Sequence, residues 1–191
     1  MGAAPVARLT VEEYLAMDRA AEVASEYHDG EVFSICGVTA EHSLINANLT
    51  VAVGTRLQNS PCRVYASPLR VRVSPKNFVY PDLMVICGKP VFTDESADTV
   101  INPKVIVEVL SPSTESYDYG LKFKLYRNLA SLEEYIWVEP DTPTVEVFRK
   151  AGSEWRFATV TGMNSVLNVE SLGLAIPLGE IYDRIEFPPG T

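Results

Sequence analysis

The chain has 191 residues, of which 47% are hydrophobic and 21% charged, and this length suits one globular domain across residues 1–191 rather than two. The net charge of −9 argues against non-specific adhesion to nucleic acid, because neutralising phosphates normally takes clustered lysine and arginine. A local field or a bound divalent cation can reverse the sign inside an acidic groove, so the charge does not exclude a nucleic-acid substrate.

Membrane and disulfide-rich classes are not expected. No apolar run approaches the roughly 20 residues of a membrane span, and the N-terminal residues have no signal-peptide core, so we expect a cytoplasmic protein. The three cysteines, Cys36, Cys62 and Cys87, are an odd number without CxxC spacing. This pattern predicts reduced cysteines rather than a disulfide framework or a zinc cluster.

A short helix and a hairpin are expected first along the chain. Thr10 and Glu13 have the spacing of a capping box at the head of a helix, and Asp29-Gly30 is typical of a hairpin turn. The longest helix is expected to begin after Thr39, an N-cap residue, because apolar residues recur near helical spacing in TAEHSLINANLTVAVGTRLQ.

Short β-rich segments bounded by Pro, Gly, Asn or Ser make up most of the remaining chain. A helix near residues 117–129 separates the fourth segment from the fifth, and a turn at residues 151–153 joins the last two. This order predicts an α/β or α+β domain with a mixed sheet. The predicted strands are CRVYA, LRVRV, YPDLMVICG, KVIVEVLS, EYIWVEP, TVEVFRK and EWRFATVT.

Glu108 is unusual because it lies inside the apolar run VIVEVL, in a strand that should be covered on both faces. An unpaired carboxylate buried there would be costly or would hold a proton. A cation, hydrogen-bond donors or a metal should therefore lie close to it. An internal salt bridge without any catalytic role is the structural alternative.

Asp82 begins the strand of YPDLMVICG, and its side chain can face the same side as Glu108 if the two strands are neighbours. Two carboxylates within a few Å of each other cannot both ionise cheaply without a cation, and Mg²⁺ or Mn²⁺ meets that need. Taken alone, Asp82 could instead accept backbone hydrogen bonds at the start of its strand.

The predicted helix after Glu108 supplies a candidate third group. Asp118, Lys122 and Tyr126 form one i, i+4, i+8 row beside an apolar stripe that should face the sheet. Lys122 therefore leans towards the core, whereas Lys124 projects roughly 200° away from it. Lys122 could orient an attacking water and stabilise charge on a phosphoryl group. On the residues alone, an ordinary helix ion pair is favoured for Asp118 and Lys122, and a core-edge aromatic for Tyr126.

Four segments in order, YPDLMVICG, NPKVIVEVLSPST, YDYGLKFKLY and EYIWVEP, resemble the Uma-type restriction endonucleases, a prokaryotic group within the PD-(D/E)xK nuclease superfamily. The resemblance extends upstream to EYHDGEVFSICG and TAEHSLINANL and covers about residues 10–160. It implies a restriction-endonuclease-like core with flanking helices and additional β-hairpins.

The resemblance assigns Asp82 as the aspartate of the PD element, Glu108 as the second acid and Lys122 as the catalytic lysine. The usual superfamily pattern places the lysine two residues after the second acid, where this chain has Leu110. The resemblance therefore implies that the lysine has moved to the following helix.

Two further residues match the family pattern. Glu26 matches an N-terminal glutamate that could be an additional metal or water ligand, and His42 matches a helix histidine. On pattern alone, a solvated or capping role is favoured over a ligand role for both residues.

We therefore expect a Mg²⁺- or Mn²⁺-dependent endonuclease that hydrolyses phosphodiester bonds of nucleic acid, with DNA as its partner. An acidic dyad beside a lysine supplies the groups that metal-assisted hydrolysis needs. The alternatives are a catalytically inactive nuclease fold that serves as a binding or assembly module, and a hydrolase of small phosphate esters. A homodimer is also considered, with TVEVFRK or EWRFATVT as an interface edge.

Overall fold

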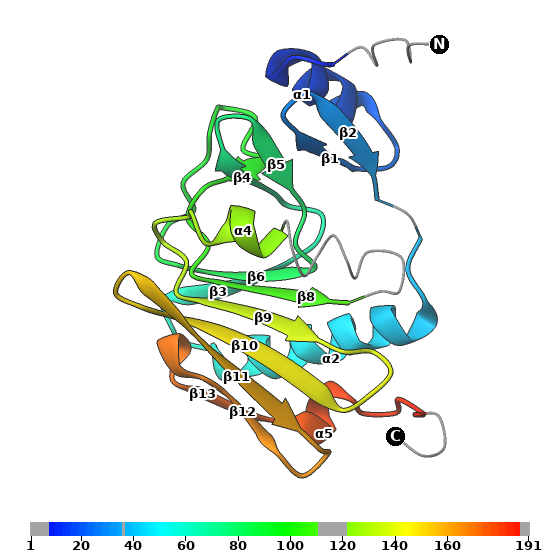
Figure 1. Ribbon diagram of the computed structural model, residues 1–191, viewed down its shortest axis with the longest axis vertical. Helices are drawn as coiled ribbons and strands as arrows, with labels where there is room; N and C mark the ends of the chain where they lie inside the picture. The colour runs from blue at the N-terminus through cyan, green and yellow to red at the C-terminus, as the bar shows by residue number, and fades with distance from the viewer. Residues whose placement is uncertain (1–7, 36, 111–121, 188–191) are drawn as a thin grey trace.

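The computed structural model describes residues 8–35, 37–110 and 122–187, and it combines many strands with a few helices (Figure 1). None of the helices in these three ranges is long and apolar enough to cross a membrane. The helices are α1 (Val11–Ala20), α2 (Ala40–Arg56), α4 (Phe123–Tyr126) and α5 (Leu178–Ile181), with a 3-10 turn η2 at Glu170–Leu172. The strands are β1 (Ser25–His28), β2 (Glu31–Ser34), β3 (Cys62–Ala66), β4 (Arg70–Ser74), β5 (Asn77–Val79), β6 (Leu83–Cys87), β7 (Thr99–Val100), β8 (Val105–Val109), β9 (Glu134–Val138), β10 (Thr144–Ala151), β11 (Glu154–Thr161), β12 (Val166–Val169) and β13 (Leu174–Pro177).

A six-stranded sheet, called sheet B below, forms the centre of the domain in the order β11-β10-β9-β8-β6-β3. Strands β8 and β9 are parallel, and every other neighbouring pair in this sheet is antiparallel. The connection from β8 to β9 contains α4, because parallel neighbours need a long crossover. Every residue of β8 and β9 is buried, as their apolar sequences predict for strands covered on both faces.

Alternate residues of β8 face different layers of the domain. Val107 and Val109 pack with α2 and the C-terminal strands β12 and β13. Ile106 and Leu110 pack with α4 and with a second, five-stranded sheet, called sheet A, of order β2-β1-β5-β4-β7. Figure 1 shows α2 in cyan on one side of sheet B, with α4, β4 and β5 on the other. Glu108 shares the parity of Ile106, so it belongs to the layer of α4 and sheet A.

The local signals of the sequence are confirmed. Thr10 and Glu13 make both hydrogen bonds of a capping box at α1, and the side chain of Thr39 accepts a backbone N–H at the start of α2. Asp29 and Gly30 have positive φ angles in the turn between β1 and β2. The predicted strands are present as β3, β4, β6, β8, β9, β10 and β11, so the mixed α+β fold is confirmed as well.

Several elements were not predicted from the sequence. Strands β5 and β7 have three and two residues, which is too short for a periodic pattern. The hairpin of β12 and β13 and the short helix α5 were also not assigned. In the predicted helix at 117–129, the structure has α4 at Phe123–Tyr126, and residues 117–121 lie outside the described residues.

A disulfide joins Cys62 of β3 to Cys87 of β6, so the prediction of reduced cysteines is wrong for this pair. The two residues lie directly opposite each other in the antiparallel register. Their separation of 25 residues along the chain gives no local signal, and only the strand pairing brings them together. Cys36 lies outside the described residues.

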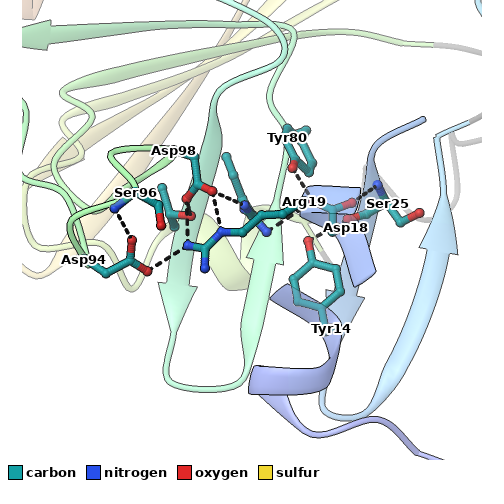
Figure 2. Close-up of polar contacts among 10 residues, drawn as sticks. Tyr14, Asp18, Arg19, Ser25, Tyr80, Asp94, Ser96 and Asp98 are labelled. Carbon is teal, nitrogen blue, oxygen red and sulfur yellow. Dashed lines mark hydrogen bonds and ion pairs between the residues drawn. The ribbon is translucent and has the colours of Figure 1, made fainter. Parts of the chain in front are cut away.

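An ion-pair network with Arg70 and Asp18 at its buried centre attaches α1 to sheet A (Figure 2). Arg70, at the start of β4, is 2% exposed, and its guanidinium lies 3.1 Å from a carboxylate oxygen of Asp18 and 3.0 Å from one of Asp98. Arg19 contacts Asp98 at 2.7 Å and Asp94 at 2.8 Å. Because a buried guanidinium needs compensating charge, this network fixes α1 against β4 and the segment that precedes β7.

We expect Asp98 to make the stability of the protein sensitive to acid. The hydrogen bond from Arg19 lowers the pKa of Asp98 from 3.8 to about 2. Since the folded-state pKa lies below the unfolded value, the ion pair stabilises the protein above about pH 4, and this contribution is lost as the pH falls towards about 2. Solvent screening of the partly exposed side chain reduces the contribution to about 1 kcal/mol.

Urea unfolding of Asp98→Asn tests this expectation. The variant should be less stable than wild type near neutral pH, and most of the difference should be lost as the pH falls through about 2, because Asp98 in the folded protein then becomes neutral. Glu95→Gln removes an exposed carboxylate from the same segment and is the control. An equal loss of stability at both pH values would show that the charge of Asp98 is not what stabilises the fold.

Candidate active site

The carboxylate of Glu108 is buried and binds two donors from the segment that follows β8. Lys122 Nζ lies 3.2 Å from Glu108 Oε1, and the Tyr126 hydroxyl donates to the same oxygen at 2.8 Å. Glu108 and Lys122 are 3% and 8% exposed. A buried carboxylate in an apolar strand needs such partners, and the structure places the expected cation and a hydrogen-bond donor beside it.

Lys122 and Tyr126 reach Glu108 because they lie one helical turn apart on the same side of the chain at α4. Lys124 is exposed, which agrees with its opposite position around the helix. Burial raises the pKa of Tyr126 well above its usual value of 10.0, and the negative charge of Glu108 raises it further. The phenol therefore stays protonated and keeps donating to the carboxylate. Asp118, the remaining member of this row, lies outside the described residues.

Glu26 approaches the same lysine from the other sheet. It is on β1 of sheet A, and its Oε1 lies 3.3 Å from Lys122 Nζ. The same oxygen accepts the backbone N–H of Tyr80 at 3.1 Å. The ammonium of Lys122 is thus shared by one carboxylate from sheet A and one from sheet B.

Asp82 completes the group at the beginning of β6. The pairing of Leu83 with Val107 shows that β6 and β8 are neighbours, so Asp82 lies opposite Glu108 one step along the register. The Oδ2 atom of Asp82 accepts the backbone N–H of Val109 at 2.9 Å and lies 3.2 Å from His42 Nε2. Asp82 therefore lies opposite Glu108, as expected for a pair of site carboxylates. It also accepts a backbone hydrogen bond at the start of its strand, which is the structural role that its sequence position alone allows.

His42 is in the first turn of α2 and is buried, so α2 contributes to this group from the opposite layer of the domain. The side chain of Asp82 is 20% exposed, whereas those of Glu26 and Glu108 are 7% and 4% exposed. Asp82 is therefore the most accessible of the three carboxylates.

The donor set suits a hard cation. The carboxylates of Glu26 and Glu108 both contact Lys122, and Asp82 lies opposite Glu108 on the neighbouring strand. Carboxylate oxygens are the ligands that Mg²⁺ and Mn²⁺ prefer. In the part of the chain that the structure describes, no group of three or more His, Cys, Asp or Glu side chains is arranged to hold a metal ion. Mg²⁺ commonly uses only one or two carboxylates together with water and substrate phosphate, so Asp82 and Glu108 fit this kind of site.

Sequence reasoning allowed for a backbone donor to Asp82 but did not identify it, and it missed the backbone donor to Glu26. The N–H groups of Tyr80 and Val109 hold Glu26 and Asp82, respectively. A backbone N–H leaves no signature in the sequence, because every residue except proline has one. Only the pairing of distant segments reveals these contacts.

Comparisons with known proteins agree on one family. A family model named Uma2 and described as "Putative restriction endonuclease" matches residues 11–179. Two proteins of Synechocystis sp. are similar, "Uncharacterized protein sll1609" with 33% identity over 82% of this chain and 90% of that protein, and "Uncharacterized protein slr1290" with 30% identity over 96% of each chain.

A solved structure has the same fold. It is described as a "putative nuclease belonging to DUF820" from Anabaena variabilis, and the match has a TM-score of 0.76 with 19% identity and covers 91% of this chain and 97% of that one. The restriction-endonuclease-like fold expected from the sequence is therefore confirmed. Because the family model spans most of the chain and the relatives match over nearly their whole length, this protein belongs to the Uma2 family.

Proposed function

We propose that this protein is a metal-dependent endonuclease that hydrolyses phosphodiester bonds of nucleic acid, with DNA as its main substrate and the cytoplasm as its location. The matched family and the structural neighbour are both described as nucleases, which supports this class of activity. The observation that carries the proposal is the buried Lys122, shared by Glu26 and Glu108 next to the more accessible Asp82.

In this proposal Asp82 and Glu108 hold Mg²⁺ or Mn²⁺. When bound, the metal would polarise the phosphoryl oxygen and lower the pKa of the attacking water. The hydrogen bond from the Val109 N–H and the contact with His42 fix the direction of the Asp82 carboxylate. Tyr126 does the same for Glu108. Both carboxylates are therefore oriented before a ligand arrives, which reduces the cost of binding it.

Lys122 has the second role. Its ammonium lies between the carboxylates of Glu26 and Glu108, at 3.3 Å and 3.2 Å. From this position it would orient the attacking water and stabilise the negative charge that builds on the phosphoryl oxygens. Glu26 would keep the ammonium in place while the substrate binds and leaves.

Cleavage by the wild-type protein tests the proposal. Supercoiled plasmid and single-stranded DNA are incubated with Mg²⁺, with Mn²⁺ or with EDTA, and a small phosphodiester such as bis(p-nitrophenyl) phosphate is tested alongside. We expect cleavage of DNA with either metal and none with EDTA. Turnover of the small ester alone would identify a different substrate class, and the absence of any hydrolysis with both metals would contradict the proposal.

One observation favours a second candidate, a nuclease fold that does not cut and serves as a binding or assembly module. Lys122 and Tyr126 already satisfy the buried Glu108 carboxylate, so the fold does not depend on a metal at this point. Metal affinity separates the two candidates, because an active site of the proposed kind must bind Mg²⁺ or Mn²⁺ and an inactive scaffold need not.

A further inference from the structure

We propose that Tyr14 and Asp18, which lie on α1 outside the candidate active site, are positioning residues that hold the Ser25–Glu26 peptide so that Glu26 meets Lys122. The inference rests on the proposed function for the claim that Glu26 serves a reaction. The positioning itself is a property of the fold and can be measured without any cleavage.

Two side chains of α1 bind the backbone N–H and the backbone carbonyl of Ser25, the residue before Glu26 (Figure 2). The carboxylate of Asp18 accepts the backbone N–H of Ser25 at 2.7 Å, and the hydroxyl of Tyr14 donates to the backbone carbonyl of Ser25 at 2.6 Å. That carbonyl belongs to the peptide bond that leads into Glu26. The direction in which the Glu26 side chain leaves the backbone is therefore set from α1.

Tyr80 connects the same group to the other end of the Glu26 side chain. Its hydroxyl donates to the second carboxylate oxygen of Asp18, and its backbone N–H donates to Glu26 Oε1 at 3.1 Å. In Figure 2 the Tyr80 hydroxyl and the Ser25 backbone lie beside Asp18. Glu26 is thus held at its backbone through Ser25 and at its carboxylate through Tyr80, and both routes meet at Asp18.

The group is buried, and its charges are paired. The side chains of Asp18 and Arg70 are each 2% exposed and lie 3.1 Å apart. Burial raises the pKa of Tyr14 above its usual value of 10.0, with a further increase from the charge of Asp18. Burial and the hydrogen bond to Asp18 raise the pKa of Tyr80 in the same direction. Both hydroxyls therefore remain protonated donors at any pH at which the protein would work.

The strand that carries Glu26 gives it little support of its own. β1 has four residues, and its register with β5 contains only the pairs Tyr27 with Phe78 and His28 with Asn77. Glu26 lies beyond the end of the β1–β5 ladder. The other neighbour of β1 is β2, an edge strand, with which Glu26 does pair. Lys122 is attached to sheet B, so a small movement of β1 would separate Glu26 from it. Displacements of this size are costly in active sites.

A double-mutant cycle tests the inference on the full chain. Tyr14→Phe removes one hydroxyl, Glu26→Gln removes the charge that meets Lys122, and urea unfolding is measured for wild type, both single variants and the double variant. We expect the effect of Tyr14→Phe on the unfolding equilibrium constant to be at least about threefold smaller in the Glu26→Gln background. In that background the ion pair between residue 26 and Lys122 is already absent, so a shift of the residue 26 side chain cannot weaken it.

Tyr27→Phe is the matched control for this cycle. Tyr27 is also a buried tyrosine, it stacks on Tyr14 with ring centroids 4.7 Å apart, and its hydroxyl donates to a backbone carbonyl, that of Leu9, at 2.7 Å. Its effect should be the same in both backgrounds. A second cycle with Tyr80→Phe, which keeps the Tyr80 N–H, should show the same coupling as Tyr14→Phe.

The double-mutant cycle tests the positioning inference, and the cleavage assay tests the proposed function, so either claim can be overturned without the other. If Tyr14→Phe and Tyr80→Phe both combine additively with Glu26→Gln, as Tyr27→Phe is expected to do, the positioning inference is overturned even in a protein that cleaves DNA. Where wild type does cleave, we also expect Tyr14→Phe to lower kcat with little change in KM, and an unchanged kcat would likewise overturn it. Absence of cleavage by wild type would overturn the proposed function and leave the measured coupling in place.

Discussion

Replacing Lys122 by methionine is expected to abolish nucleic-acid cleavage, with kcat lowered by at least about 100-fold. Methionine keeps an unbranched side chain of similar length in the buried site but carries no charge, so it can neither orient a water nor stabilise a phosphoryl oxygen. The measurement is single-turnover cleavage of a plasmid at saturating metal. Single turnover isolates the chemical step from product release.

The same variant should also lose stability, because it leaves Glu26 and Glu108 buried beside each other without their shared cation. Removing one partner of a buried ion pair typically costs about 3–5 kcal/mol. Circular dichroism must therefore show that the variant is folded at the assay temperature. Lys124→Ala, which removes an exposed lysine two residues along the chain, should behave like wild type. If Lys122→Met cleaved as fast as the Lys124→Ala control, Lys122 would have no part in the chemistry.

Asp82→Asn is expected to abolish cleavage and to weaken metal binding, with a loss of at least about tenfold in Mn²⁺ affinity. The substitution removes the negative charge that a hard cation requires and leaves an amide oxygen that can still accept the Val109 N–H. The fold should therefore suffer less than in Lys122→Met. Isothermal titration calorimetry with Mn²⁺ measures the affinity directly, without any substrate.

Asp141→Asn, which changes an exposed aspartate outside the candidate site, is the control for the titration. Equal Mn²⁺ affinity for wild type, Asp82→Asn and Asp141→Asn would place any bound metal elsewhere. If wild type did not bind Mn²⁺ or Mg²⁺ at all, the non-cutting module would become the better account of this protein.

The burial of Glu108 and the orientation of Lys122 were predictable because both depend on local geometry. A run in which both odd and even positions are apolar indicates a strand covered on two faces, and a carboxylate inside such a strand requires a partner. Helical spacing then places Lys122 and Tyr126 on one side of their segment, and both do contact Glu108. In each case the residues that give the signal lie close together in the sequence.

The contribution of sheet A could not be predicted in the same way. Nothing near Glu26 indicates that it meets Lys122, because the contact depends on how sheet A docks on α4 and sheet B. Arg70 stands in the alternating stretch LRVRV, a pattern that would suit a solvated side chain, yet its partners Asp18 and Asp98 come from two other segments and make it one of the most buried residues. Contacts between distant segments decide these positions, and local patterns do not encode them.

The most direct test of the central claim is plasmid cleavage with Mn²⁺ by wild type, Asp82→Asn and Lys122→Met, prepared identically and shown to be folded. We predict that wild type converts supercoiled plasmid to nicked and linear forms and that both variants leave it intact. Cleavage that persists undiminished in both variants would contradict the assignment of the active site to Asp82, Glu108 and Lys122.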